Sequence, residues 1–371
     1  MNKRIVGIFL LVCLLTVSIC GCDGIGFSDS PYGESGTQGS QTTAGNGSGE
    51  SSFFVHFIDV GQADAALILC SGKTMLIDGG NKEDSDLIYA YLQKQNITHL
   101  DYVVCTHAHE DHVGGLSGAL TAATVGTVYA PVTDYDSKAF RDFAQKTAER
   151  GREITVPQAG DVFNLGDSVV TVLGPRKSYS DTNNTSIVLR IVYGGTSFLF
   201  TGDMESDAET NLLESGVMLK STVLKVGHHG SSSSTSYRFL KEVAPKYAVI
   251  SVGKDNQYDH PNEDVLSRLR DADTVLYRTD MQGDIVCVSD GTRVSFVMAM
   301  NADAQTNPTE NYKTPSDGAA VSEYAFIGNL NTKKFHKTDC RYLPDEKNRI
   351  YFTAKQEAAD AGYESCGTCK P

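Results

Sequence analysis

Beyond its first 19 residues, the sequence lacks any apolar run long enough to cross a bilayer. A membrane-spanning helix needs about 20 consecutive apolar residues, which excludes channel-forming segments from the rest of the chain. Positive charge is also scarce: 32 Lys and Arg residues face 46 Asp and Glu residues, and the formal net charge is −14. An acidic surface argues against broad electrostatic capture of nucleic acid, although metal ions or local basic residues can offset it.

Large apolar residues are almost absent from residues 23–52, which are rich in Gly, Ser and Thr. Such a segment cannot bury enough surface to fold, and we expect a flexible tether. A second stretch, 301–322, has two prolines and many small polar residues, which is typical of a linker. The predicted divisions are a leader (1–21), a linker (22–52), a main domain (53–298), a second linker (299–322) and a C-terminal domain (323–371).

The N-terminus has the pattern of an export signal. Lys3 and Arg4 precede an apolar segment, 5–19, that is short for a membrane span. Residues 19–22 (ICGC) resemble the lipobox of bacterial lipoproteins, in which cleavage before the last Cys leaves it as the lipidated first residue. We therefore expect an exported, membrane-anchored lipoprotein carrying its lipid on Cys22, with an ordinary secretory signal as the alternative.

A short His-rich stretch is the most informative part of the chain. Four potential metal ligands fall within six residues: His107, His109, Asp111 and His112. They follow a strand-like apolar segment, 100–105, so a buried strand would deliver them into a loop. Imidazole and carboxylate suit zinc and similar divalent ions. The spacing suits one ion or two, because one pair of side chains can face each metal.

Strand-like and helical segments alternate along the main domain. The strand-like runs are 54–60, 65–69, 74–78, 169–173, 186–193, 197–201, 223–226 and 247–252. Helical spacing is found at 87–95, 137–150, 208–215, 237–243 and 262–271. This alternation with short loops predicts an α/β fold in which helices cover two sheets.

Motifs in a fixed order resemble the metallo-β-lactamase superfamily and, within it, the hydrolase domains of ComEC-type competence proteins. The motifs are 57–64 (FIDVGQAD), 76–80 (LIDGG), the His-rich loop, 183–186 (NNTS), 200–203 (FTGD), 224–231 (LKVGHHGS) and 258–262 (YDHPN). The resemblance covers about residues 53–297. It implies an αββα sandwich with metal ions at one edge of the paired sheets.

The resemblance also implies a set of metal ligands. The first site would use His107 and His109; the second, Asp111, His112 and His228; and Asp203 would bridge both. His229 is the alternative to His228. Asp78 would support the His-rich loop by hydrogen bonds. The expected ions are one or two Zn²⁺ in this site, with Mn²⁺ as an option.

One departure affects the first site. Many members of the superfamily have a further His between the His-rich loop and the bridging Asp, but this sequence has no His from 113 to 227. Asn183, Asn184 and Ser186 stand there instead. Amide and hydroxyl oxygens are weaker ligands than imidazole, so the first metal would bind loosely or be manganese. Alternatively, Asn184 and Ser186, together with His229, would hydrogen-bond a phosphate oxygen of the substrate.

The implied chemistry is hydrolysis of a phosphodiester. A divalent ion lowers the pKa of its bound water to about 7, which supplies hydroxide at neutral pH. Asp111 would orient that hydroxide, and His260 would protonate the leaving oxygen or hold the phosphate. Lys225 would contact substrate or lie solvated at a strand end. We expect a nuclease acting on extracellular DNA; the alternatives are a phosphodiesterase for cell-wall or choline-type phosphodiesters and a non-catalytic DNA-binding competence accessory.

The C-terminal segment has a second ligand pattern. His336 and Cys340 form one short pair, and Cys366 and Cys369 form another. Two such pairs match a closed structural zinc site, and the segment resembles the small zinc-binding domain of the Ada type. His336 occupies a position that is Cys in Ada itself. Disulfide formation is the rival interpretation for an exported protein, but three Cys cannot pair completely.

Overall fold

The computed structural model describes residues 52–308, 326–338, 340, 342–344, 348–352 and 355–371. The predicted leader, Cys22, almost all of the first linker and most of the second lie outside these residues. Among the described residues, no helix has both the length and the apolar character required to span a membrane.

The first sheet of the main domain has eight strands. Their spatial order is β15 (Val294–Met298), β14 (Ile285–Ser289), β1 (Phe53–Phe57), β2 (Ala66–Cys70), β3 (Lys73–Ile77), β4 (His99–Val104), β5 (Thr124–Tyr129) and β6 (Ile154–Thr155). The neighbours from β3 to β6 are parallel, whereas β15, β14, β1, β2 and β3 pair antiparallel.

The second sheet has seven strands. Their order is β13 (Val275–Arg278), β12 (Tyr247–Ile250), β11 (Val223–Lys225), β10 (Thr196–Phe200), β9 (Val188–Tyr193), β8 (Ser168–Gly174) and β7 (Val162–Leu165). The four strands β10 to β13 are parallel. Parallel strands deliver their following loops to one edge of a sheet, and these loops carry the residues of the candidate site.

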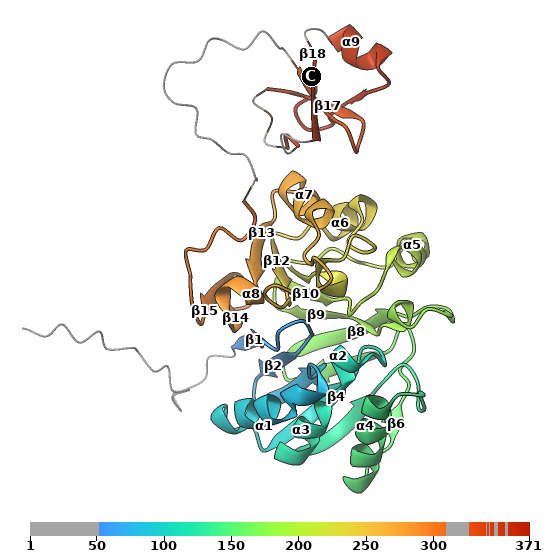
Figure 1. Ribbon diagram of the computed structural model, residues 1–371, viewed down its shortest axis with the longest axis vertical. Helices are drawn as coiled ribbons and strands as arrows, with labels where there is room; N and C mark the ends of the chain where they lie inside the picture. Colours follow the sequence, from blue (N-terminus) through green and yellow to red (C-terminus); the bar gives the residue numbers. More distant parts are fainter. Residues whose placement is uncertain (1–51, 309–325, 339, 341, 345–347, 353–354) are drawn as a thin grey trace, which may run out of the picture. The chain divides into compact units, whose positions relative to one another are not determined.

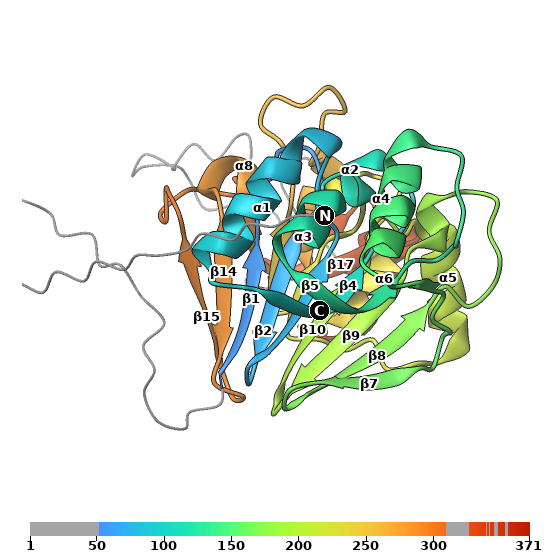
Figure 2. The same cartoon turned by 90° about the horizontal axis from the view of Figure 1, so that it is seen from below.

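Helices cover the outer face of each sheet, so the main domain has four layers (Figures 1 and 2). The helices are α1 (Ser85–Lys94), α2 (Glu110–Val113), α3 (Leu116–Ala122), α4 (Lys138–Glu149), α5 (Ser206–Ser215), α6 (Tyr237–Val243), α7 (Glu263–Asp271) and α8 (Thr279–Gln282). Short 3₁₀ turns occur at η1 (Lys82–Asp84), η2 (Asn183–Thr185) and η3 (Gly227–Gly230).

Three apolar clusters hold these layers together. One joins α1, α3 and α4 to the first sheet, for example through Leu92 and Phe143. A second fills the space between the sheets, where the rings of Phe53 and Phe198 pack in a tilted arrangement with centroids 4.7 Å apart. A third packs α5, α6 and α7 on the second sheet, for example through Leu240. Burial of each large side chain contributes about 1.5–3 kcal/mol, so apolar burial is a major source of stability for the sandwich.

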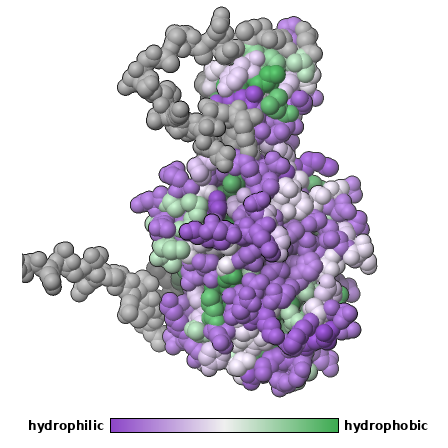
Figure 3. Space-filling model, in the orientation of Figure 1, coloured by the Kyte–Doolittle hydropathy of each residue, from purple (hydrophilic) through white to green (hydrophobic). Residues whose placement is uncertain are grey.

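The predicted αββα sandwich is therefore confirmed. The five predicted helices appear as α1, α4, α5, α6 and α7, with ends that shift by at most two residues. The exposed surface remains polar on the face shown in Figure 3, where hydrophobic side chains of the main domain form small, separate patches.

The C-terminal segment forms a small unit with a separate four-stranded sheet. Its sheet has the order β18 (Arg349–Phe352), β16 (Phe326–Asn329), β17 (Lys334–Lys337) and β19 (Glu364–Ser365), and α9 (Lys355–Asp360) follows β18. Its buried apolar cluster consists of Phe335, Phe352, Ala358 and Tyr363. A core of this size rarely stabilises a fold without a covalent or metal cross-link.

Candidate metal centre

The His-rich loop begins where β4 ends, and a buried carboxylate shapes it. Asp78, which follows β3, accepts hydrogen bonds from the Thr106 backbone N–H at 2.7 Å and from the Thr106 hydroxyl at 2.7 Å. Its Oδ2 also lies 2.9 Å from His112 Nδ1. This contact holds a proton of His112 on Nδ1, so that Nε2 is the nitrogen whose lone pair would bind a metal once the ring is neutral. The supporting role expected for Asp78 matches these contacts.

Four side chains converge beyond this loop: Asp111, His112, Asp203 and His229. His229 Nε2 lies 3.2 Å from Asp111 Oδ2 and 3.5 Å from Asp203 Oδ2. His112 Nε2 lies 3.2 Å from Asp203 Oδ1 and 3.7 Å from Asp111 Oδ2. Ligand atoms around a tetrahedral ion with bonds of about 2.0–2.1 Å are separated by roughly 3.3 Å. The observed separations therefore fit the edges of such a tetrahedron.

Buried polar atoms without partners give an independent test of this fit. His112 Nε2 and Asp203 Oδ1 are both buried, and apart from each other, 3.2 Å away, neither has a polar partner that satisfies it among the described residues. A buried polar group without a partner costs about 1–3 kcal/mol, and native proteins avoid it unless a ligand or ion satisfies the group. The donor set, two imidazoles and two carboxylates, suits zinc, so these residues fit the metal that the motifs imply.

The charges of the cluster depend on one another. Burial acts to raise the pKa of Asp203, but His112 and His229 outweigh it and hold this pKa well below the ordinary range. Burial acts to lower the pKa of His229, yet Asp203 and Asp64 raise it to about 10. Without a metal, positive imidazoles therefore balance the carboxylates, and a divalent cation would replace those protons when it binds.

The ligand set expected for the first metal is less complete than that of the second. His107 Nε2 and His109 Nδ1 face each other at 3.1 Å, and His107 Nε2 is 4.0 Å from Asp203 Oδ2. Asp203 Oδ1 faces His112, and Oδ2 is near both His229 and His107, so this carboxylate stands between the two groups of ligands. Within the part of the chain that the structure describes, His107 and His109 do not join a convergent group of three ligands.

The adjacent residues His228 and His229 face different partners. His229 is the one in the four-residue cluster, and its Nδ1 lies 3.0 Å from the Ser251 carbonyl. His228 Nδ1 lies 3.1 Å from Glu205 Oε1, and its Nε2 lies 3.6 Å from Asp203 Oδ2. The sequence placed His228 in the second site with His229 as the alternative; the geometry favours the alternative.

The NNTS motif lies behind the bridging carboxylate. Asn184 is buried, and its side-chain carbonyl accepts from the backbone N–H groups of Glu205 and Ala208, each at 3.2 Å. The Ser186 hydroxyl donates to the Asn183 carbonyl and accepts from the Asp203 N–H at 3.1 Å. Both side chains expected to bind substrate thus have internal partners, and they hold the loop that carries Asp203.

Gly202 is required in this loop. Its φ is +51°, and a Cβ there would lie 2.8 Å from Ser186 Oγ and 2.9 Å from Thr106 Cβ. Only glycine adopts this conformation without strain and leaves room for the two neighbouring loops.

His260 lies half-buried beside the cluster, with its ring centroid 5.7 Å from that of His228. The Gln62 carbonyl accepts from the Gly253 N–H at 3.1 Å, so the Gln62 amide nitrogen points at His260 Nδ1, 3.4 Å away. Burial, with His228 and His229, lowers the pKa of His260 to about 4. At neutral pH its ring is therefore uncharged, with the proton on Nε2.

The sequence predicted no role for two residues near the cluster, Asp64 and Glu205, and it predicted for Lys225 a role other than the one observed. Asp64 and Lys225 form a buried ion pair next to His229, with Lys225 Nζ 2.9 Å from Asp64 Oδ1. Glu205 accepts from Asn183, Ser233 and His228. Asp64 and Glu205 both stand inside or beside motifs used for the resemblance, and that position was the only signal available.

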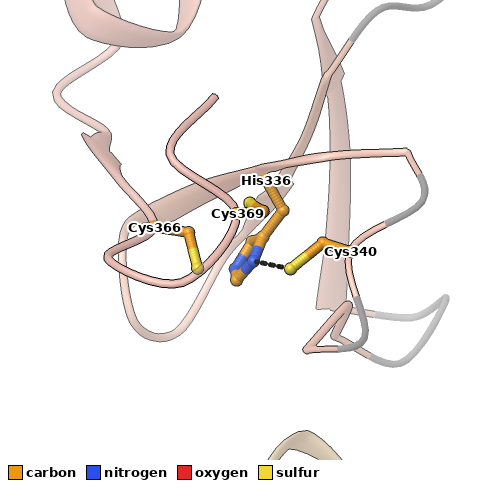
Figure 4. A group of neighbouring side chains, drawn as sticks. All are labelled: His336, Cys340, Cys366 and Cys369. Atoms are coloured by element: carbon orange, nitrogen blue, oxygen red, sulfur yellow. Dashed lines mark hydrogen bonds between the residues drawn. The ribbon is translucent and has the colours of Figure 1, made fainter.

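The four predicted ligands of the C-terminal unit do converge. Figure 4 shows His336, Cys340, Cys366 and Cys369 pointing toward one another, and their ligand atoms all lie within 4.8 Å. The three Cys are free thiols, so no disulfide of this unit is present among the described residues. Backbone N–H groups of Lys337 and Thr368 point at Cys369 Sγ and Cys366 Sγ, each at 3.4 Å. Such bonds stabilise thiolates, the form that binds zinc.

Known protein families match both the main domain and the C-terminal unit. Residues 58–254, just over half of the chain, match the family described as the metallo-beta-lactamase superfamily. Residues 315–371 match the metal binding domain of Ada. The Ada-type match implies a zinc site in the C-terminal unit, as predicted.

Curated relatives share the main domain. ComE operon protein 3 of Bacillus subtilis (strain 168) is 32% identical over 250 residues, covering 62% of this chain and 32% of that protein. Competence protein ComA of Neisseria gonorrhoeae is 33% identical over 227 residues, covering 61% of this chain and 30% of that protein. The chain thus spans about a third of the length of these relatives.

A solved structure, the metallo-beta-lactamase fold protein YhfI from Bacillus subtilis, has 14% identity and a TM-score of 0.46 over 64% of this chain and all of that one. The family match, the predicted motifs and the αββα layers agree. The chain belongs to the metallo-β-lactamase superfamily of metal-dependent hydrolases and carries an Ada-type metal-binding domain at its C-terminal end.

Proposed function

We propose that this chain is a metal-dependent phosphodiesterase, and that its substrate is a nucleic acid strand outside the cytoplasm. The observation that carries the proposal is the convergence of Asp111, His112, Asp203 and His229 at separations that suit one divalent ion. His107 and His109, together with Asp203, would hold a second ion. Zinc suits the two imidazoles and two carboxylates of the four-residue cluster, and manganese is the alternative for the weaker first site.

The bound metal would activate water and stabilise charge on the phosphoryl oxygens, as metal ions do in hydrolases. Asp111 is half-exposed at the rim of the cluster, so its carboxylate is available to orient an attacking water. Glu205 fixes Nδ1 of His228, and this turns Nε2 toward the centre. His260 would donate a hydrogen bond from Nε2 to a phosphate oxygen, because its neutral ring holds the proton there.

This role for His260 differs from protonation of the leaving oxygen, the first of the two roles considered from the sequence. A side chain whose pKa lies near 4 is a poor proton donor at neutral pH, but it can hold a phosphate by hydrogen bonding. The roles of Asp111 and His260 are thus orientation of the nucleophile and orientation of the phosphate.

The choice of nucleic acid rests on the relatives. One of them is named competence protein ComA and another ComE operon protein 3, and each matches about three fifths of this chain. The lipobox-like sequence at Cys22, which lies outside the described residues, adds the proposal of export and a lipid anchor. The chain would then stand at the outer face of a membrane, where DNA from the surroundings is accessible.

A second candidate, hydrolysis of small or wall-linked phosphodiesters, is favoured by the hollow beside His260. This hollow measures about 940 Å³, and its charged lining comprises Lys254, Asp255, Asp259, Arg278, Asp280 and Asp303. Arg278 is already paired with Asp280 through two contacts at 2.6 and 3.0 Å. The remaining charged lining, three Asp residues and Lys254, is acidic on balance and would repel a long polyanion that extends into it.

The decisive experiment compares two substrates. The chain from Ser52 onward would be incubated with Zn²⁺ or Mn²⁺ and either single-stranded DNA or a chromogenic phosphodiester. His109→Ala is the inactive variant, and His99→Ala, at an exposed histidine on β4, is its matched control. DNA cleavage that only His109→Ala abolishes would establish the nuclease. Cleavage of the small diester alone would select the second candidate, and turnover of neither would contradict both.

A further inference from the structure

Lys225 is an unusual residue to find inside this fold. It ends β11, between Phe200 of β10 and Val249 of β12, and only 4% of its surface is exposed. Lysine is almost never fully buried unless it is paired, because removing an ammonium from water costs several kcal/mol. Its ammonium lies 2.8 Å from the Val226 carbonyl and 2.9 Å from Asp64 Oδ1.

This ion pair lies out of reach of substrate. Lys225 and Asp64 line a cavity of about 10 Å³, enough for one water molecule and for nothing larger. Neither role considered from the sequence, a substrate contact or a solvated strand end, agrees with this position. The pair must act, if it acts at all, through its neighbours.

The neighbour that matters is His229. Asp64 Oδ1, the oxygen that faces Lys225, also lies 3.2 Å from His229 Nδ1, and the Ser251 carbonyl lies 3.0 Å from the same nitrogen, so the two oxygens hold this edge of the ring together. The opposite ring nitrogen, Nε2, is the one that faces Asp111 and Asp203. A contact on one ring nitrogen sets which nitrogen carries the proton and how the ring is turned. Lys225, Asp64 and His229 therefore form a chain of contacts that leads from the end of β11 to the cluster.

Asp64 is also tied to the loops on both sides. Its N–H donates to the Asp111 carbonyl at 3.1 Å, and its own carbonyl accepts from the Gly80 N–H at 2.8 Å. A shift of the Asp64 backbone would consequently displace Asp111 as well as release His229. The carboxylate has a fixed place only while a cation holds it, because burial alone would drive it toward water or protonation.

We propose that Lys225 is a positioning residue of the metal centre: it anchors the Asp64 carboxylate, which in turn holds His229 with Nε2 directed at the second metal. Asp78 supports His112 in the same way, so each imidazole of the second site has its own buried carboxylate. Of these two carboxylates, only that of Asp64 contacts a lysine ammonium among the described residues. The inference rests on the proposed metal centre and not on the identity of the substrate.

The test measures zinc binding by the full chain, by competition with a chromophoric chelator. Lys225→Met removes the ammonium and keeps the length of the side chain, and Lys241→Met, at an exposed lysine of α6, is the matched control. Loss of a partner that orients a metal ligand typically weakens binding about 10- to 100-fold. We expect that loss for one zinc in Lys225→Met and Asp64→Asn, and wild-type affinity in Lys241→Met. The zinc of the C-terminal unit is bound by all variants alike, so it does not contribute to the difference in zinc binding between them.

A purely structural role would give a different result. It would lower the melting temperature of metal-free Lys225→Met without changing its zinc affinity, and that outcome would overturn the inference. Lys225→Arg keeps the positive charge and should retain more zinc affinity than Lys225→Met, which provides a second test if the Met variant folds poorly. When Lys225→Met and Asp64→Asn are combined, the loss of zinc affinity should not exceed that of Asp64→Asn alone, because the two residues act as one unit.

The readout also separates this inference from the proposed function. If the wild-type chain binds zinc only in its C-terminal unit, the proposed metal centre fails together with the role of Lys225. If the wild type binds zinc in the main domain and Lys225→Met binds it equally well, only the role of Lys225 is refuted.

Discussion

At the scale of single residues, His228 and His229 show how the chain places two adjacent imidazoles in different roles. Both have φ near +50°, the left-handed region that non-glycine residues rarely adopt. Each such conformation costs of order 1–3 kcal/mol and persists only where the surroundings determine it. Glu205 holds His228, whereas Ser251 and Asp64 hold His229, so the two side chains cannot exchange places.

Alanine substitutions should therefore separate the two histidines. His229→Ala removes one of four convergent ligands, and we expect the second-site metal to be lost, with turnover falling at least about 100-fold. His228→Ala should leave that metal bound while turnover falls. Metal content measured on the purified variants, beside their rates, distinguishes them. Equal loss of metal in both variants would contradict this division of roles.

The sequence predicted the ligand types but not every partner. Spacing alone identified the His-rich loop, since its four ligands are neighbours in the chain. The choice between His228 and His229 depends on side-chain directions set by two strained residues, which no pattern reveals. Lys225 ends a strand of the second sheet, whereas Asp64 lies in the loop between β1 and β2 of the first sheet, so their pairing follows only from the folded backbone.

His56 provides a test of buried charge away from the metal centre. Its Nδ1 lies 2.9 Å from the Tyr91 hydroxyl, and burial lowers its pKa to about 4. Between pH 6.5 and about 4 the unfolded chain binds a proton that the folded protein excludes, so stability falls as the pH falls through this window. The loss should total roughly 3 kcal/mol and should cease below pH 4, where the folded state is protonated too.

We expect His56→Gln to remove this part of the acid sensitivity, because glutamine stays neutral and can still bond Tyr91. Thermal melts of the metal-free protein between pH 7.5 and 4 would measure it. The difference in melting temperature between variant and wild type should be constant above pH 6.5 and should favour the variant increasingly below it. Parallel pH profiles for the two proteins would show that His56 is not the group responsible.

At the scale of elements, the 3₁₀ turn η2 and helix α5 form a support behind the bridging Asp203. A helix begins with N–H groups that have no partner within the helix. Asn184, from a distant turn, satisfies two of the N–H groups at the start of α5, those of Glu205 and Ala208. The loop between β10 and α5 is thereby fixed at both ends, and Asp203 lies in that loop.

Asn184→Ala should consequently act on stability more than on substrate binding. Loss of a helix-capping side chain costs about 0.5–2 kcal/mol, and burial of the Asn184 carbonyl places this variant toward the upper end. We expect a lower melting temperature and a lower turnover number with an almost unchanged KM. Thr182→Ala, in the same turn, is the matched control. A raised KM with an unchanged melting temperature would instead support the substrate contact expected from the sequence.

The strands and helices were largely predictable because their signals are local. Alternation and helical spacing placed α6 at Tyr237–Val243 to the residue and set β8 and β10 within one residue at each end. The pairing of strands is not local. β14 lies beside β1 in the first sheet although the two are separated by most of the domain, and only the family resemblance could imply such an arrangement.

At the scale of the whole molecule, the two folded parts differ in what stabilises them. The main domain has three extensive apolar clusters, whereas the buried apolar cluster of the C-terminal unit has four residues. For so small a core, zinc binding supplies folding free energy directly. Removal of the metal should therefore affect the two parts unequally.

Cys366→Ser replaces one of the four ligands of the C-terminal unit, and this variant should show that inequality. We expect the unit to unfold, so that limited proteolysis degrades it rapidly while the main domain stays intact. Hydrolysis of a small phosphodiester should be unchanged, because the ligands proposed for that reaction belong to the main domain. Ser365→Ala, at the neighbouring exposed residue on β19, controls for the substitution itself. A C-terminal unit that resists protease equally in Cys366→Ser, Ser365→Ala and the wild type would show that its apolar cluster suffices for folding.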